Sequence, residues 1–445
     1  MTEVIKLNYL YLLLILEGIL LIFVASYTKL DFTSPSFITI TMFLLSTVCI
    51  ILNEEYWDVH FLPKTYFAVF GGLFLIAILE FFIKRMTYRK NVWIDQQTYI
   101  ARGSIYFDFG VKILFLTITT IFSLIYIVSV IRTGGQNSGN LLGAISIVHT
   151  DEEASVGLLA TICVRMMRLI CYPCLYYLTY NVIVCREKLI SNIWLLLVIL
   201  EAFLVIFFSG VRSTYLYYIF AGVFYTVMLQ RFKKGWREVK LKNYIKPIAI
   251  FLGIFVAVFI GSRTIVKGHD FTSTEIEYFT FYLGSPLHLF NKIIDDTTAA
   301  FPTHYNNILG AHTFKWFYQE LYKFGLISTN IEATNFSYVG GGFYGGGNVY
   351  TMFSYALHDF GYIGMYIYIA LLYFIYDWIY YKKFKYSSSI TTKGVTLMVF
   401  GSFYYIILMT FYGALTNQMK LQTILETLIM VVIFKYLPKL RCRKR

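Results

Sequence analysis

The sequence contains few charged residues, and acidic residues are the scarcer kind. Only 14% of its 445 residues are charged, with 25 Asp and Glu against 38 Lys and Arg. Hydrophobic residues make up 58%, and the mean hydropathy is +0.63. Soluble globular domains carry about 25% charged residues. This balance therefore excludes a soluble globular protein and predicts a single membrane domain that spans residues 1–445.

The net charge of +13 does not indicate a nucleic-acid partner. A nucleic-acid-binding domain gathers its basic residues on one face or along one helix. Here they occur in short clusters between apolar stretches, which is typical of the loops of a multi-pass membrane protein. We therefore expect membrane lipid as a partner and no nucleic acid.

Cysteine and cofactor motifs are also scarce. Five of the six cysteines lie in or beside apolar stretches, so no extracellular disulfide framework is predicted. Cys171 and Cys174 match C-x-x-C without the βαβ pattern of a redox domain. The histidines show no H-E-x-x-H spacing, and no D-x-D or G-K-[ST] motif faces the predicted cytoplasmic side. We expect neither a metal nor another cofactor.

The apolar stretches are long enough to cross a bilayer as helices, which takes about 20 residues each. About eleven such stretches predict an all-α polytopic membrane protein. The predicted spans are 7–27, 36–52, 66–83, 111–131, 157–181, 191–209, 213–229, 247–262, 360–381, 394–412 and 421–437.

The basic clusters set the orientation. They follow the third, seventh and ninth spans and fill the tail, at 84–90, 231–246, 382–385 and 435–445. Because short cytoplasmic loops carry the excess of Lys and Arg, all four clusters and the C-terminus are predicted to be cytoplasmic.

One long loop, 263–358, falls on the opposite, extracytoplasmic side. Connections of this length in a compact domain are often functional. Two of its segments, Glu275–Ile294 and Phe314–Phe324, are aromatic and amphipathic. We expect them to form short helices that lie on the membrane surface.

Four arginines stand inside or at the outer ends of apolar spans: Arg165, Arg168, Arg212 and Arg263. An arginine at the bilayer centre costs roughly 2.5–3.5 kcal/mol on insertion scales. One interpretation is an anion site that opens outward, since guanidinium groups bind phosphate oxygens in pairs. The alternative is structural: Arg165 pairs with Glu201 in the next span, and Arg212 and Arg263 reach to the interface.

The best candidate for a general base is His358, followed by Asp359, where the long loop returns to the membrane. Glu275 and Glu277 are weaker alternatives. Aromatic residues gather before this point and suit the apolar faces of sugars, although local packing is the alternative for each. They are Tyr338, Phe343, Tyr344, Tyr350 and Tyr355.

Residues Gly345–Gly364 include Asn348-Val-Tyr350-Thr and Asp359-Phe-Gly361-x-x-Gly364. This stretch resembles the G-x-N-x-Y-T…D-F-G-x-x-G pattern of bacterial oligosaccharide repeat-unit polymerases, the Wzy-type O-antigen and capsule polymerases. The turn Ser209–Ser213 and the segment Tyr282–Pro286 are similar to that family as well. The resemblance covers about 190 residues, 205–395.

The resemblance implies a GT-C-like fold in the bacterial plasma membrane. It also implies polymerisation of undecaprenyl-diphosphate-linked oligosaccharide units at the outer face by inverting transfer without a metal. Arg212 and Arg263 match arginines that hold the diphosphate, and His358 with Asp359 would complete the catalytic set. Substrate contacts would come from Arg165, Arg168, Tyr282, Asn348 and Tyr350. A chain-length regulator protein would be a second partner.

Other classes of function remain open at this point. An O-antigen ligase would perform the same chemistry on a different acceptor. A flippase of lipid-linked oligosaccharide would be expected to show internal repeats, which we do not find. A membrane acyltransferase would use an intramembrane histidine. A metal-assisted acidic site at Glu54, Glu55 and Asp58 would compete with their interpretation as a solvated turn.

Overall fold

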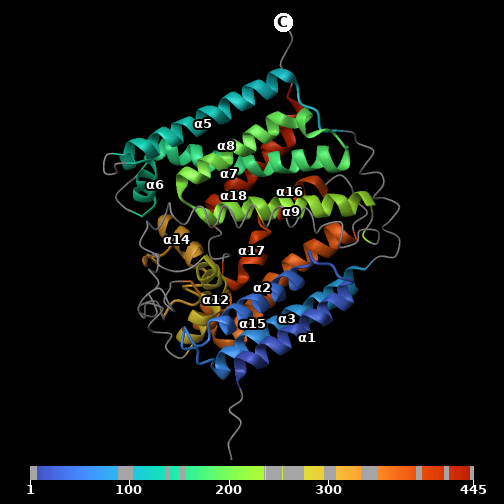
Figure 1. Cartoon of the computed structure of the whole chain (residues 1–445), viewed down its shortest axis with the longest axis vertical. Helices are drawn as coiled ribbons and strands as arrows, with labels where there is room; N and C mark the ends of the chain where they lie inside the picture. The colour runs from blue at the N-terminus through green and yellow to red at the C-terminus, as the bar shows by residue number, and fades with distance from the viewer. Residues whose placement is uncertain are drawn as a thin grey trace, which may run out of the picture. The chain divides into compact units, whose positions relative to one another are not determined.

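We describe the protein from a computed structural model. The described residues are 8–88, 104–135, 140–150, 156–234, 236, 253, 275–294, 307–331, 349–386, 393–414 and 420–440. Within these ranges all regular secondary structure is helical, and no strand occurs (Figure 1). The all-α prediction is therefore confirmed for this part of the chain.

Nine helices within the described ranges are long and apolar enough to cross a membrane. They coincide with nine of the predicted spans: Tyr9–Thr28, Pro35–Leu52, Pro63–Thr87, Phe109–Gly135, Leu158–Val184, Leu189–Ser209, Phe353–Lys385, Gly394–Phe411 and Leu421–Lys439. The predicted span 213–229 is helical, within Arg212–Lys234, but this helix is not among the nine candidate membrane spans. The remaining one, 247–262, lies outside the described residues, apart from Gly253, which is helical.

The chain divides into two compact units, each built from separate parts of the sequence. Unit 1 comprises Met1–Arg89, Ser273–Tyr386 and Ile406–Ile424, and unit 2 comprises Lys90–Thr272, Ser387–Tyr405 and Leu425–Arg445. The chain passes between the units within α17 (Tyr405–Leu408) and again within α18 (Leu421–Tyr436).

Unit 1 is built around α2, α3 and α15. Helix α15 packs along α3, and α2 contacts both α1 and α12 (Figure 1). Asn291 of α12 accepts hydrogen bonds from the Leu62 N–H and the Thr65 hydroxyl, which fixes α12 at the start of α3. The elements are α1 (Tyr9–Thr28), α2 (Pro35–Leu52), α3 (Pro63–Thr87), α12 (Glu275–Ile293), α14 (Lys315–Lys323), α15 (Phe353–Trp378), η4 (Ile379–Lys385) and η5 (Met409–Phe411).

Unit 2 packs α5, α7 and α8 against one another, and α9 against α7 and α16. Its core is rich in tyrosine: the Tyr176 ring meets those of Tyr225 and Phe434, and the Tyr177 hydroxyl donates to the Phe434 carbonyl. The elements are α5 (Phe109–Gly135), α6 (Leu141–Thr150), α7 (Leu158–Thr179), η1 (Tyr180–Val184), η2 (Leu189–Asn192), α8 (Ile193–Ser209), α9 (Arg212–Lys234), α16 (Lys393–Ser402) and η7 (Leu437–Lys439).

Both amphipathic segments of the long loop are helical, as α12 and α14. Helix α14 keeps no buried residue, as expected of a surface helix. Helix α12 differs from that expectation, because Gly284–Asn291 are all buried and the helix packs against α2. Its C-terminal half is therefore part of the core of unit 1.

Candidate functional site

A sharp bend separates the first two turns of α15 from its long membrane-spanning part. Gly361 has φ 65° and ψ −172°, so the segment Phe353–Phe360 is a short helix of its own. This backbone conformation is essentially restricted to glycine, because a Cβ atom would clash with the neighbouring backbone. The bend places His358 and Asp359 just ahead of the long helix.

The carboxylate of Asp359 holds the loop segment that precedes α14. Its Oδ2 atom accepts hydrogen bonds from the backbone N–H of His312 at 3.1 Å, and from the Thr313 N–H and hydroxyl, both at 2.7 Å. Oδ1 adds a longer contact of 3.4 Å with the His312 N–H. Hydrogen bonds to an ionised acceptor are about twice as strong as neutral ones, so this carboxylate fixes the position of the loop.

Two glycines leave room for the Phe360 side chain at this junction. Gly310 has φ 71°, and a Cβ there would lie 2.8 Å from the Phe360 ring and 2.7 Å from the Phe314 ring. A Cβ at Gly364 would lie 2.2 Å from the Phe360 Cβ. The Asp-Phe-Gly-x-x-Gly stretch thus has a local explanation: Asp359 binds the loop, Phe360 packs beneath it, Gly361 bends the chain and Gly364 leaves room.

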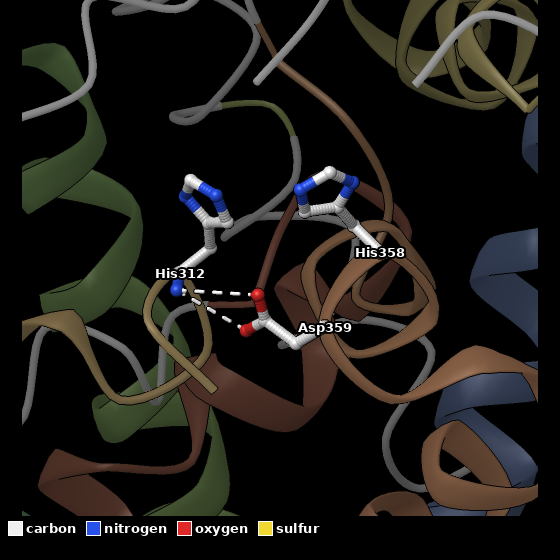
Figure 2. Close-up of side chains that lie close together, drawn as sticks. All are labelled: His312, His358 and Asp359. Atoms are coloured by element: carbon white, nitrogen blue, oxygen red, sulfur yellow. Dashed lines mark hydrogen bonds between the residues drawn. The ribbon is translucent and has the colours of Figure 1, made fainter. Parts of the chain in front are cut away.

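This arrangement brings two imidazoles together. The ring centroids of His312 and His358 are 4.8 Å apart at an interplanar angle of 61°, and the His312 ring also lies 6.5 Å from the Tyr355 ring. Figure 2 shows both imidazoles on one side of the junction, while the Asp359 carboxylate turns toward the His312 backbone. His312 is 2% exposed and His358 is half-buried, so His358 is the more accessible of the two.

The junction also holds three residue types that can bind a metal ion, in His312, His358 and Asp359. One candidate ligand atom from each lies within 4.8 Å of the others. However, Zn–N bonds of about 2.0 Å draw ligand atoms closer together than this limit. The Oδ2 atom of Asp359 is already occupied by three hydrogen bonds, so only Oδ1 would remain for a metal ion. The donor set therefore fits a hydrogen-bonded junction better than a metal centre.

Arg165 and Arg168 lie on α7, in unit 2. Arg165 is exposed, whereas Arg168 is half-buried and its Nε atom has no hydrogen-bond partner among the described residues. Arg168 interacts electrostatically with Tyr126, Tyr217 and Tyr218. A guanidinium whose Nε atom lacks a partner among the described residues, with tyrosines nearby, offers a favourable environment to an anionic oxygen.

The alternative of a buried Arg165–Glu201 pair is wrong in this structure. Glu201 accepts a hydrogen bond of 2.5 Å from the Thr120 hydroxyl, and its other oxygen has no partner within the described part of the chain. The two side chains face different neighbours, since Glu201 contacts Thr120 and Arg165 is exposed.

The remaining predicted site residues are described only in part. Arg212 begins α9, and Gly210 with φ 66° ends α8 close to the His149 side chain. Arg263 and Asn348 lie outside the described residues, as do Tyr338, Phe343 and Tyr344. Glu275 begins α12, and Glu277 is half-buried in its first turn.

The two tyrosines predicted to contact substrate are not equally accessible. Tyr282 is half-buried on α12, and its ring contacts that of Phe281. Tyr350 is 2% exposed, and burial raises the pKa of its hydroxyl to about 12. Tyr350 therefore belongs to the core of unit 1, which favours the packing interpretation over a direct glycan contact.

The acidic turn has a structural role at one of its residues. Glu54 accepts hydrogen bonds from the Asn8 amide at 3.3 Å and from the Tyr11 hydroxyl at 2.8 Å. It thereby ties the start of α1 to the end of α2. Asp58 instead lies 3.5 Å from His60 with both side chains largely exposed.

These observations define an all-helical, multi-pass membrane protein. Comparisons with protein-family models, with curated proteins and with solved structures find no match for the chain. The sequence had indicated His358 and Asp359 but not their partner. His312 lies 47 residues before Asp359, and only the glycine before its Ala-His-Thr triplet could have marked a turn there.

Proposed function

We propose that this protein is a membrane glycosyltransferase that polymerises undecaprenyl-diphosphate-linked oligosaccharide repeat units. It would act at the outer face of the bacterial plasma membrane, with its C-terminus in the cytoplasm. The support comes from the multi-pass helical architecture and from the stretch Gly345–Gly364, which resembles that of the repeat-unit polymerases.

The observation that carries the proposal is the His312–His358 pair at the junction ahead of the long part of α15. In an inverting transfer, the acceptor hydroxyl oxygen attacks the anomeric carbon as the bond from that carbon to the diphosphate oxygen breaks. The hydroxyl proton passes to a base, and the diphosphate leaves with the electron pair. His358 would accept the proton, and the His312 ring beside it would fix its orientation.

The leaving diphosphate requires positive charge at a fixed position, because its new negative charge develops in the transition state. The outer-end arginines Arg212 and Arg263 are proposed for this role, and Arg165 and Arg168 for binding the carrier. The half-buried Arg168, with an unpartnered Nε atom, supports an anion-binding function for α7.

The test is polymerisation in liposomes that contain purified protein and a lipid-diphosphate-linked oligosaccharide, with products separated on a gel. His358→Gln keeps a polar side chain but cannot accept the proton as imidazole does. The rate at which long glycans form should therefore fall about 10²–10⁴-fold. His60→Gln is the matched control, because the His60 side chain is exposed and its imidazole lies 3.5 Å from the equally exposed Asp58 carboxylate.

Two results would overturn the proposal. One is formation of long glycans by His358→Gln at the wild-type rate and length, which would show that His358 is not the general base. The other is transfer of the glycan only to an added lipid A acceptor, never to a second repeat unit, which would identify a ligase. A ladder lost in His358→Gln and retained in His60→Gln would support polymerase chemistry.

A further inference from the structure

Unit 1 buries a group of acidic side chains at one end of its helices. Glu80 lies near the end of α3 and Asp377 near the end of α15, and both are 0% exposed. Their carboxyl groups are electrostatic neighbours. Acidic residues inside membrane helices are rare and costly, and they commonly mark ion or proton sites.

The two carboxyl groups differ in their hydrogen bonding. Glu80 accepts a bond of 3.1 Å from the Ser36 N–H at the start of α2 and another from the Tyr381 hydroxyl. The N-terminal end of a helix stabilises negative charge, so Glu80 is held in a surrounding that suits a carboxylate. Asp377 has no hydrogen bond to either oxygen within the described part of the chain.

A buried hydroxyl group lies in the same region as the two carboxyl groups. The Ser34 hydroxyl, at the N-cap of α2, is 0% exposed and lacks a hydrogen-bond partner among the described residues. It lies within hydrogen-bonding reach of the Glu80 carboxyl, although no hydrogen bond of regular geometry joins the two groups. Burying a hydroxyl without a regular hydrogen bond is unfavourable, and burying an unpaired carboxylate is more so. Both oxygens of Asp377 thus lack a partner among the described residues, and the Ser34 hydroxyl has only an irregular contact with Glu80.

The nearby cations are already engaged. Lys385 forms an ion pair of 2.5 Å with Asp31, and the Lys84 ammonium group donates to the Tyr27 carbonyl. A third ammonium group near Lys84, that of Lys29, is exposed to solvent. Away from solvent, the ammonium groups of Lys84 and Lys385 face the carboxyl groups of Asp31, Glu80 and Asp377. If these five groups are ionised, one negative charge lacks a counter-charge that is shielded from solvent.

An occupant must therefore carry one positive charge and accept several oxygen ligands. A proton on Asp377 would give one of its oxygens a hydrogen to donate but would leave the other oxygen without a donor. A divalent ion would reverse the excess charge. A small, hard monovalent cation satisfies both conditions, since hard cations prefer carboxylate, hydroxyl and carbonyl oxygens.

We propose that Asp377, Glu80 and Ser34 form a binding site for one Na⁺ ion between α2, α3 and α15. The bound ion would link three helices of unit 1 through their side-chain oxygens. This site is independent of the proposed glycosyl transfer, because it involves none of the residues assigned to that chemistry.

The test is thermal unfolding of the purified full-length protein in detergent, in NaCl and in choline chloride at equal ionic strength. An ion that binds only the folded state raises the unfolding midpoint as its concentration rises. The wild-type midpoint should therefore increase with Na⁺ concentration and remain constant in choline. Asp377→Asn should lose this dependence, and Asp58→Asn, which alters an exposed carboxylate, should keep it.

Binding of radioactive ²²Na⁺ to the same preparations gives a second readout. If Asp377→Asn does not fold, Ser34→Ala keeps every acidic residue and should weaken Na⁺ binding by several-fold. The proposal is overturned if the wild-type midpoint is equal in Na⁺ and choline, or if Asp377→Asn binds ²²Na⁺ as the wild type does. A midpoint that responds to pH alone and loses that response in Asp377→Asn would identify a proton site instead.

Discussion

The Thr313 N–H donates a hydrogen bond of 2.7 Å to the carboxylate of Asp359, 46 residues later in the chain. Together with the bonds from His312 and from the Thr313 hydroxyl, it joins the loop before α14 to the start of α15. The relative position of His312 and His358 depends on this carboxylate.

Removal of the Asp359 carboxylate should therefore loosen the loop. Asp359→Ala leaves two backbone N–H groups and a hydroxyl without their acceptor, which costs about 1–3 kcal/mol for each group that stays buried. We expect a lower unfolding midpoint and faster protease cleavage within 307–331. Thr313→Val removes a single donor and should cost about 0.5–1.5 kcal/mol. Unchanged cleavage in Asp359→Ala would contradict this role.

Gly361→Ala should destabilise the protein through backbone strain. A residue with a Cβ atom at φ 65° and ψ −172° costs about 1–3 kcal/mol, so the bend should open or the midpoint should fall. Gly18→Ala is the matched control, since Gly18 lies within α1 and a Cβ there meets no atom within 4 Å. That variant should be as stable as the wild type or up to about 1 kcal/mol more stable. Equal midpoints in both variants would show that the bend is not strained.

His288 should make stability depend on pH. It is 1% exposed beside the Trp57 ring, and burial, with a smaller contribution from Lys292, lowers the pKa of its imidazole to about 4. An unfolded histidine titrates near 6.5. Between these values the unfolded state binds more protons, so stability is full above about pH 6.5 and falls as the pH drops toward 4.

The loss is about 3 kcal/mol when the pH has fallen below both values. The measurement compares unfolding midpoints at neutral and mildly acidic pH for the wild type and for His288→Phe. The substituted protein should lose less stability on acidification. His60→Gln changes an exposed histidine and should follow the wild type. An identical pH response in wild type and His288→Phe would exclude His288 as the cause.

The proposed diphosphate site should depend on charge at two arginines. Arg212→Ala and Arg263→Ala should each lower polymerisation about 10²–10³-fold, the usual effect of removing one electrostatic contact to a transition state. Single repeat units should persist on the gel. Lysine at either position keeps the charge but loses the paired hydrogen bonds and should give intermediate activity. A full ladder from either alanine variant would remove that arginine from the site.

Chelation tests the choice between a hydrogen-bonded junction and a metal centre at His312, His358 and Asp359. Because Oδ2 of Asp359 is occupied by backbone donors and only Oδ1 remains for a metal, dialysis against a strong zinc chelator should leave polymerisation and thermal stability unchanged. Stoichiometric zinc in the purified protein, together with loss of activity after dialysis, would establish a metal site instead.

Most of the membrane spans could be predicted from the sequence, because the length and hydropathy of an apolar stretch are local properties. The role of Asp359 could not, since the residues that donate to it are more than 40 positions away. The Arg165–Glu201 prediction failed for a related reason. Depth in the membrane follows from counting residues, whereas the neighbour that a side chain faces depends on helix rotation, and Glu201 faces Thr120.

The buried acids are visible in the sequence as acidic residues inside apolar spans. Glu17, Glu80 and Asp377 each stand within a predicted span, and all three are 0% exposed. Their presence among apolar residues was the available signal. Which helices enclose them could not be known, because α3 and α15 meet only in the folded chain.

The pairing of α3 with α15 also constrains biosynthesis. Tyr381, which donates to Glu80, follows it by 301 residues. At ribosomal rates of about 5–20 residues per second, Glu80 is inserted roughly 15–60 s before that tyrosine is made. During this interval the nascent α3 carries an acidic side chain in the bilayer without its eventual covering helix. Chains that terminate before residue 353 should therefore be preferred substrates for membrane quality-control proteases.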